Sequence, residues 1–228
     1  MGGIRGMNEG RIYLAVIGDI KKSRDLKNRN EIQKKIKETL NDINTKYTED
    51  ITSKFLITLG DEFQGLLHTG KNVLKIVTEI KMRLYPVKLR FGLGAGKITT
   101  DINYEMALGA DGPGYYCARE AINLLKEKEH GKRVVPADIC IKMEVHKEDR
   151  ELLINTVFEL LKTIEDGWTV RQREIIWDML KNQDGQQRTA DRLGITQSTV
   201  QKMLAAGTYY TYERALGNVE KVLEEEIR

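Results

Sequence analysis

The sequence contains 228 residues, with 37 Lys and Arg against 34 Asp and Glu, which gives a formal net charge of +3 at pH 7. A chain of this length can form one large domain, or one domain with a small appendage, and we expect the second. The near balance of charge does not by itself indicate a nucleic-acid or a membrane partner. No apolar stretch approaches the roughly 20 residues of a membrane span, so we expect no membrane partner.

The distribution of charge along the chain is more informative than its sum. Residues 147–228 hold 12 basic and 15 acidic side chains, which leaves 25 basic and 19 acidic in residues 1–146. The basic front part suits an anionic ligand such as a nucleotide. Cys117 and Cys140 have no Cys-x-x-Cys spacing, and the first residues include no hydrophobic region of the secretory kind. We therefore expect a cytoplasmic protein with reduced thiols.

The front part of the chain alternates strand and helix patterns. Apolar residues without interruption predict a central strand, apolar residues at helical spacing predict amphipathic helices, and Pro86 ends the second of these helices. The predicted order is strand, helix, β-hairpin, helix, strand and helix, at residues 13–20, 30–47, 54–68, 71–84, 87–100 and from about 113.

Two strand-like runs end in an acidic turn. Gly60-Asp61-Glu62 interrupts an apolar run, and a glycine at such a bend allows a tight connection, so we predict a hairpin that presents two adjacent carboxylates. The first strand ends in Gly18-Asp19. Side by side in one sheet, these ends would gather the oxygen ligands that a hard divalent cation requires. The structural alternative is that Asp19 caps its loop and Asp61 stabilises its own turn.

Glycines recur at every second position in the later strand, at Gly92, Gly94 and Gly96. Glycines on one face of a strand leave room for a second backbone or for a ligand, and the pattern does not choose between the two. A Gly-rich loop then leads into the helix that begins near Pro113. Free amide groups and the helix dipole at such an N-terminus favour an anion.

From residue 147 onward the periodicity is helical only, and we expect an all-helical domain over residues 147–228. Thr169 is the predicted N-cap of one helix. In the helix before it, a set of aliphatic residues is expected to form one buried face: Leu152, Leu153, Val157, Leu160, Leu161 and Ile164.

Residues 186–204 have the pattern of a helix-turn-helix motif. Ala190 is the small residue required where two helices touch, Gly194 lies at the turn, and Ile195 and Val200 fill the core between the helices. This pattern predicts that the second helix is held with one face toward solvent.

The second helix of the motif carries residue types that suit DNA. We predict contacts to base edges and phosphates from its N-cap, its outward face and two flanking arginines: Thr196, Gln197, Ser198, Gln201, Lys202, Arg188 and Arg192. The alternative is a helical bundle that serves dimerisation or binds the front domain. The last helix, within residues 207–227, is a predicted dimer interface, because a helix-turn-helix protein that recognises a two-fold operator requires one. We therefore expect a homodimer.

Three features of the front domain together resemble the palm domain of class III nucleotidyl cyclases. They are a strand ending in Gly-Asp-Ile, a hairpin with Gly-Asp-Glu-Phe at its bend, and a Gly-rich strand leading to a helix with Ala118-Arg119. The hairpin also resembles that of the GGDEF diguanylate cyclases. The whole chain, including the helix-turn-helix tail, is similar to the SatD family of bacterial and archaeal proteins.

The cyclase resemblance implies a metal-dependent nucleotide site. It implies that Asp19 and Asp61 bind Mg²⁺ or Mn²⁺, with help from the backbone of Ile20, and that Glu62 is a further ligand. Two such ions bridging a triphosphate would stabilise the charge that develops at phosphorus. Residues adjacent to these carboxylates are assigned to the nucleotide and its phosphates: Ile20, Lys21, Lys22, Arg24 and Gly60.

The chain departs from the cyclase pattern at two positions. In cyclases the helix after the Gly-rich strand carries an Asn four residues before an Arg, and both assist the reaction. Arg119 occupies the Arg position and is the candidate catalytic residue, but Tyr115 occupies the Asn position. Leu59 stands where the GGDEF string has its first glycine. Binding of nucleotide and metal without turnover is therefore at least as consistent with the sequence as catalysis.

These observations predict an α+β fold in which a ferredoxin-like palm (βαββαβ) over residues 10–145 precedes an all-helical helix-turn-helix domain. The leading hypothesis is a DNA-binding regulator whose palm senses a nucleoside triphosphate or another nucleotide. The first alternative is a metal-dependent nucleotidyl cyclase or transferase that uses Asp19 and Asp61. The second alternative is a non-catalytic protein-interaction module.

Overall fold

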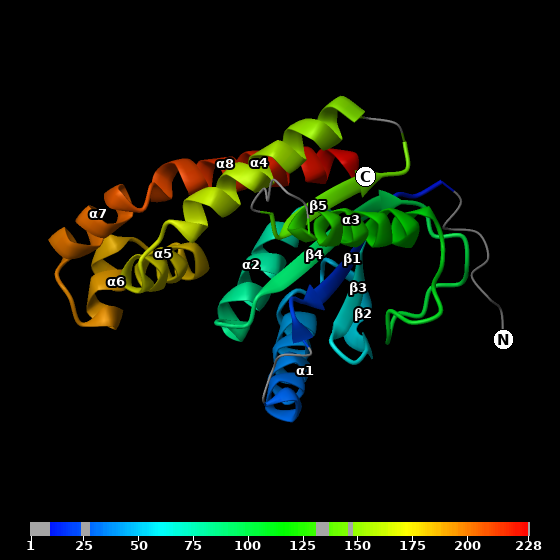
Figure 1. Cartoon of the computed structure of the whole chain (residues 1–228), viewed down its shortest axis with the longest axis horizontal. Coiled ribbons are helices and arrows are strands. Elements are labelled where there is room, and N and C mark those ends of the chain that lie inside the picture. Colours follow the sequence, from blue (N-terminus) through cyan, green and yellow to red (C-terminus); the bar gives the residue numbers. More distant parts are fainter. Residues whose placement is uncertain (1–9, 24–27, 131–136, 146–147, 228) are drawn as a thin grey trace.

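The computed structural model of the chain describes residues 10–23, 28–130, 137–145 and 148–227 (Figure 1). A five-stranded sheet with helices α1 to α3 forms the front part, and the part after the last strand is helical. In chain order the elements are β1 (Tyr13–Ile20), α1 (Arg29–Lys46), β2 (Ile51–Leu59), β3 (Glu62–Leu67), α2 (Val73–Leu84), β4 (Leu89–Gly96), α3 (Pro113–His130), β5 (Ile139–Met143), α4 (Glu148–Asp166), α5 (Val170–Asn182), α6 (Gln186–Leu193), α7 (Gln197–Ala206) and α8 (Tyr209–Glu226).

The strands of the sheet lie in the order β2-β3-β1-β4-β5. β1 runs antiparallel to both β3 and β4, β2 runs antiparallel to β3, and β5 runs parallel to β4. The first six elements thus form a ferredoxin-like βαββαβ unit, which confirms the predicted α+β class, and β5 extends the sheet after α3. All residues of β1 are buried, as predicted for a central strand.

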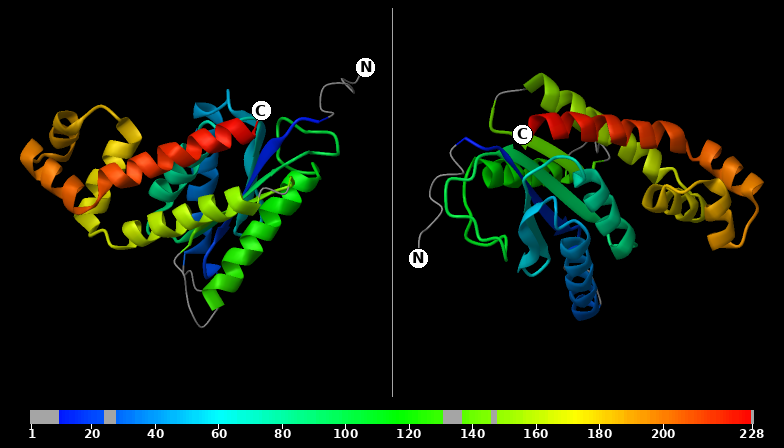
Figure 2. Two further views of the ribbon diagram at one scale, coloured as in Figure 1. Left: turned by 90° about the horizontal axis from the view of Figure 1, so that it is seen from above. Right: turned by 180° about the vertical axis from the view of Figure 1, so that it is seen from behind.

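Helices α1 and α2 cover one face of the sheet, and α3 covers the other (Figure 2). Because side chains alternate along a strand, Leu14 and Val16 of β1 lie in the core with α1 and α2, whereas Ala15 and Ile17 lie in a second core with α3. Asp19 continues the second set. The carboxylate at the end of β1 therefore belongs to the face that α3 covers.

The glycines of β4 allow α3 to lie directly on the strand. A Cβ atom at Gly94 would lie less than 3.0 Å from the carbonyl oxygen of Gly114, and one at Gly96 would lie 2.7 Å from the amide nitrogen of Gly114. A Cβ atom at Gly92 would meet the carbonyl oxygen of Ala118. Of the two uses that the glycine pattern left open, the structure shows the close approach of a second backbone.

Helix α4 begins beside β5 and extends away from the sheet, and α8 runs back along α4 to the sheet (Figure 2). The predicted apolar face of α4 is wrong in part, because Leu152, Leu153 and Leu160 are exposed. The buried positions of α4 include Ile154, Phe158 and Leu161, together with two glutamates. The physical reason is that aliphatic residues occupy more than half of the circumference of α4, so the neighbouring elements decide which of them are buried.

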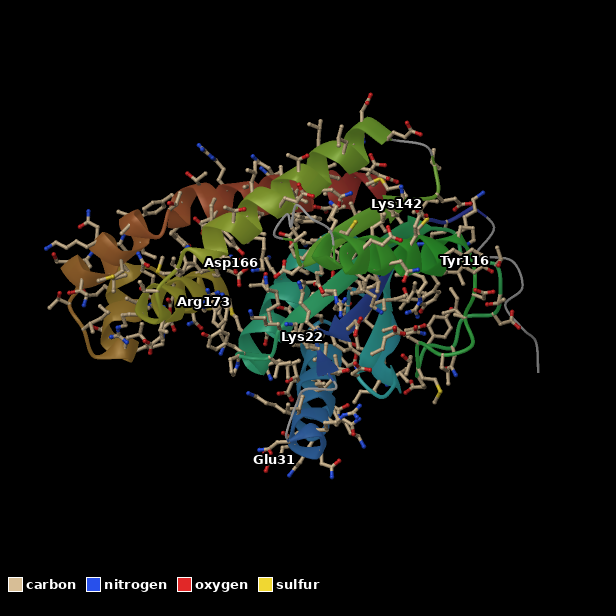
Figure 3. The ribbon with its side chains drawn as sticks, in the orientation of Figure 1. Lys22, Glu31, Tyr116, Lys142, Asp166 and Arg173 are labelled. Carbon is tan, nitrogen blue, oxygen red and sulfur yellow. The ribbon has the colours of Figure 1, made fainter. Side chains whose placement is uncertain are left out.

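A charged cluster joins the sheet part to the helical part. Lys81 Nζ on α2 lies 2.7 Å from Asp138 Oδ2 beside β5 and 2.7 Å from Glu165 Oε2 on α4. Arg173 on α5 (Figure 3) lies 3.0 Å from Glu165 Oε1. Its guanidinium packs over the ring of Trp177 and two other aromatic rings. Both carboxylates are buried, so the charges of this cluster satisfy one another away from water.

Candidate functional site

Helices α6 and α7 form the predicted helix-turn-helix. Gly194 adopts the left-handed conformation, with φ 63° and ψ 38°, which favours glycine. The Ile195 amide donates a hydrogen bond to the Ala190 carbonyl at 3.0 Å, and this bond closes the turn. Ala190, Val200 and the nearby Leu204 are fully buried, so the small residue and the core residue lie where the sequence predicted them.

The cap of α7 is also as predicted. Thr196 has extended backbone geometry, and its Oγ1 accepts a hydrogen bond from the Thr199 amide at 3.2 Å. The same hydroxyl lies 2.9 Å from Thr199 Oγ1. Thr196 therefore serves the helix end first, and its part in contacting DNA remains a prediction. Thr169 is likewise confirmed as a cap, in a capping box with Gln172 at the start of α5.

The outward face of α7 is polar and exposed. Gln197, Ser198, Gln201 and Lys202 are all exposed. None of the four side chains makes a hydrogen bond or an ion pair to another described residue. Figure 1 places α6 and α7 at the end of the molecule away from the sheet. The face is therefore available to a large partner.

The two flanking arginines differ in their surroundings. Arg192 lies 2.6 Å from both Asp178 Oδ2 and Asp184 Oδ2, and these carboxylates raise the pKa of its guanidinium, Asp184 most strongly. Arg192 thus ties α6 to α5 and to the loop before α6, so its predicted phosphate contact would require an exchange of partners. Arg188 is exposed and has no ion pair or hydrogen bond within the described ranges, so it alone of the two is free to contact a phosphate.

A second cluster lies on the sheet, where α3 crosses the ends of β1, β3 and β4. Asp19 is the cross-strand neighbour of Glu62 on one side and of Arg90 on the other. The end of β1 and the start of β3 therefore lie side by side in the sheet. Asp61 is half-buried at the bend, where the Gly60 carbonyl accepts a hydrogen bond from Gln33 at 2.8 Å.

The carboxylates of this cluster bind cationic side chains. Asp19 Oδ2 lies 3.0 Å from Lys126 Nζ and 3.4 Å from Arg90 Nη2. It forms no hydrogen bond with either, so these contacts are ion pairs only. Arg119 donates two hydrogen bonds to Glu62, with Nη2 at 2.7 Å from Oε1, and this partner raises the pKa of the Arg119 guanidinium. Sequence reasoning missed Arg90 and Lys126, because neither adjoins an acidic turn.

The remaining predicted palm residues are placed as follows. Lys21 Nζ lies 2.6 Å from Glu129 Oε1, whereas Lys22 is exposed and Ile20 is buried. Arg24 lies outside the described residues. Tyr115, at the cyclase Asn position, is buried with no partner for its hydroxyl in the described part, and burial raises the pKa of this phenol.

Carboxylate oxygens are the ligands that Mg²⁺ and Mn²⁺ prefer, but their present arrangement does not fit a metal ion. Asp19 and Glu62 each already face at least one cationic side chain. Among the residues that the structure describes, no group of three or more His, Cys, Asp and Glu side chains is placed to hold a metal ion. The cluster is therefore an ion-pair network.

No helix among the described residues is long and apolar enough to cross a membrane.

No curated protein matches the sequence. Among solved structures, the crystal structure of a regulator of polyketide synthase expression from Bifidobacterium adolescentis is similar at 14% identity and a TM-score of 0.30, over 92% of this chain and 86% of that chain. The model of the SatD family matches residues 13–223. The chain therefore belongs to the SatD family.

Proposed function

We propose that this protein is a regulator that binds DNA through α7. The observation that carries the proposal is the free polar face of α7, held by a complete helix-turn-helix core. Gln197 and Gln201 suit the edge of adenine, and Lys202 suits guanine or a phosphate. Ser198 in the first turn and Arg188 on α6 suit the phosphate backbone.

The acidic end of the chain does not oppose this function. Glu224, Glu225 and Glu226 lie at the last turn of α8, about 24 Å along the helix from Tyr209 at a rise of 1.5 Å per residue. Glu226 pairs with Arg150 on α4, and Ile227 is buried at the same end. Because α8 begins just after α7, these carboxylates lie far from the face that would meet DNA.

A salt series tests the proposal. Binding of the full chain to mixed genomic DNA fragments, measured by fluorescence anisotropy, should weaken steeply as salt rises, because phosphate contacts release counterions. Lys202→Ala should weaken binding to all sequences and reduce the log–log slope by about 1. Gln201→Ala should instead relax sequence preference. The matched control is Lys221→Ala, which changes an exposed lysine on α8, outside the proposed DNA-binding face. Absent binding, or a slope of zero, would reject the proposal and favour a helical tail used for assembly.

For the palm we propose recognition of a nucleotide through its phosphates. What supports this is the pair of half-exposed cations on α3, Arg119 and Lys126, whose side chains are 45% and 42% exposed. Both lie over carboxylates that a phosphate group would replace as partner. The basic excess of the front part of the chain favours the same ligand.

Thermal stability in the presence of ATP or GTP tests this second part. A ligand that binds only the folded protein raises the melting temperature by mass action. We expect the shift to persist in EDTA, since the carboxylates are already paired, and to fall in Arg119→Ala and Lys126→Ala. Lys37→Ala on the exposed face of α1 is the control. If millimolar nucleotide leaves the melting temperature unchanged, the proposal that the palm binds a nucleotide is rejected. A rise in melting temperature that EDTA abolishes would show instead that binding requires a metal ion.

A further inference from the structure

A cavity of about 360 Å³ lies between the sheet part and the helical part of the molecule. Its walls come from the end of α1, from α2, from the end of α5 and from the middle of α8. It is separate from the outward face of α7 and from the ion-pair network under α3. Its volume falls within the roughly 300–1,000 Å³ of pockets that bind small molecules.

Much of the cavity wall is apolar. The side chains of Leu74, Met82, Leu180 and Leu216 line it, with Tyr47 at the end of α1. Leu74 and Met82 belong to α2, while Leu180 and Leu216 belong to α5 and α8. A ligand that fills this space must therefore present an apolar body to both parts of the protein.

Three carboxylates line the same cavity, together with three lysines, Lys46, Lys75 and Lys181. Two of the carboxylates are satisfied. Glu79 accepts hydrogen bonds from Lys46, from Arg83 and from the Tyr47 hydroxyl. Glu213 accepts one from the Tyr209 hydroxyl at 2.7 Å.

Glu220 on α8 is the exception. Its Oε1 is buried, and no described residue donates a hydrogen bond to it. Burial raises the pKa of this carboxyl to about 7, while Lys75 and Lys71 oppose the rise and Glu224 and Asp50 add to it. Near neutral pH the group is therefore partly ionised, and an ammonium group beside the carboxylate would stabilise its charged form.

Gly217 is the smallest residue that lines the cavity. It lies in the interior of α8 and lines the cavity, and a Cβ atom there would have nothing within 4 Å. Glycine in a helix interior lowers helix stability relative to alanine, and neither a close contact nor a positive φ requires it at this position. A larger side chain at position 217 would enter the cavity.

We propose that this cavity binds a small apolar molecule that carries a protonated amine, with the amine donating to the Glu220 carboxylate. The apolar body packs against the leucines of α2, α5 and α8, and the site is bounded by the sheet part and the helical tail together. The proposal goes beyond DNA and nucleotide binding and does not depend on either.

Phenethylamine and its neutral analogue 2-phenylethanol are suitable probes for the full chain, with affinity measured by ligand-observed NMR. We expect the amine to bind in the millimolar range and more tightly than the alcohol, by at least about tenfold, because only the amine forms a charge-assisted hydrogen bond. Glu220→Gln should remove this preference while leaving alcohol binding unchanged. Glu225→Gln, an exposed neighbour on α8, is the matched control and should bind like the native protein.

Gly217→Leu should fill the cavity and abolish binding of both probes, with circular dichroism used to establish that the variant is folded. If it does not fold, the amine-to-alcohol ratio of Glu220→Gln decides the question alone. Equal affinity of the two probes for the native protein would overturn the proposal. So would an unchanged preference in Glu220→Gln, or undiminished binding to folded Gly217→Leu.

Discussion

Glu220 couples the stability of the fold to pH. Burial raises its pKa from the ordinary value of 4.5 to about 7, so between these values the folded protein holds a proton that the unfolded chain releases. Stability from this group is complete below pH 4.5 and is lost as the pH rises to about 7. Lys71, Lys75, Glu224 and Asp50 set the local field, and their net effect leaves the upward shift in place.

We therefore expect Glu220→Gln to be more stable than the native protein at pH 8, by about 1 to 2 kcal/mol once solvent screening of a partly exposed group is allowed for. At pH 4 the two proteins should be similar. Urea unfolding at both pH values measures the difference. Glu225→Gln should show none of this dependence, and an equal pH dependence in native protein and Glu220→Gln would contradict the assignment.

At the residue scale, roles that depend on sequence neighbours could be predicted, whereas contacts between residues far apart in the sequence could not. Thr196, Gly194 and Ala190 follow from the chemistry of a cap, a turn and a close contact, all of which depend on neighbours in sequence. Glu62 and Arg119 are separated by 57 positions, and they meet because α3 packs on β4 and β1, next to β3 in the sheet. The sequence places both residues near a site, but it carries no signal that each neutralises the other.

The close packing of α3 on β4 rests on Gly94. A Cβ atom there would meet the backbone of Gly114 and the amide of Ala118, and backbone atoms cannot move aside as a flexible side chain does. Gly94→Ala should lower the free energy of unfolding by about 3 kcal/mol or more. Urea unfolding measures the loss. Gly167→Ala is the matched control, because its nearest contact is an ordinary 3.4 Å, and a similar loss in both variants would contradict the packing argument.

At the scale of the element, the positions of the helices could be predicted from the sequence, but the faces that they bury could not. The glycines at every second position of β4 predicted open space on one face of the strand. They did not indicate whether a helix or a ligand fills it, because glycine leaves the same space for either. In α4, Leu152 and Leu160 match the helical period as well as Phe158 does, yet they are exposed and Phe158 is buried. The choice of face is a property of β5 and α8, which the local sequence of α4 does not contain.

At the scale of the whole molecule, Lys81 is the cation that pairs with carboxylates of both the sheet part and the helical tail. Its ammonium group is nearly buried, yet Asp138 and Glu165 outweigh the effect of desolvation and raise its pKa. Glu165 also binds Arg173 and lies 3.5 Å from the Tyr212 hydroxyl. Lys81 thus joins α2 to α4 and to the residue before β5, and Glu165 extends the cluster to α5 and α8.

Lys81→Met should separate these parts, because it keeps the aliphatic stem but leaves two buried carboxylates facing each other without their shared cation. Removing one partner of a buried ion pair typically costs about 3 to 5 kcal/mol. The loss should appear in urea unfolding and as faster proteolysis of the helical part. Lys88→Met, at an exposed position after α2, should change neither measurement. Native stability in Lys81→Met would show that apolar contacts alone join the two parts, since the charged cluster would then contribute nothing to their union.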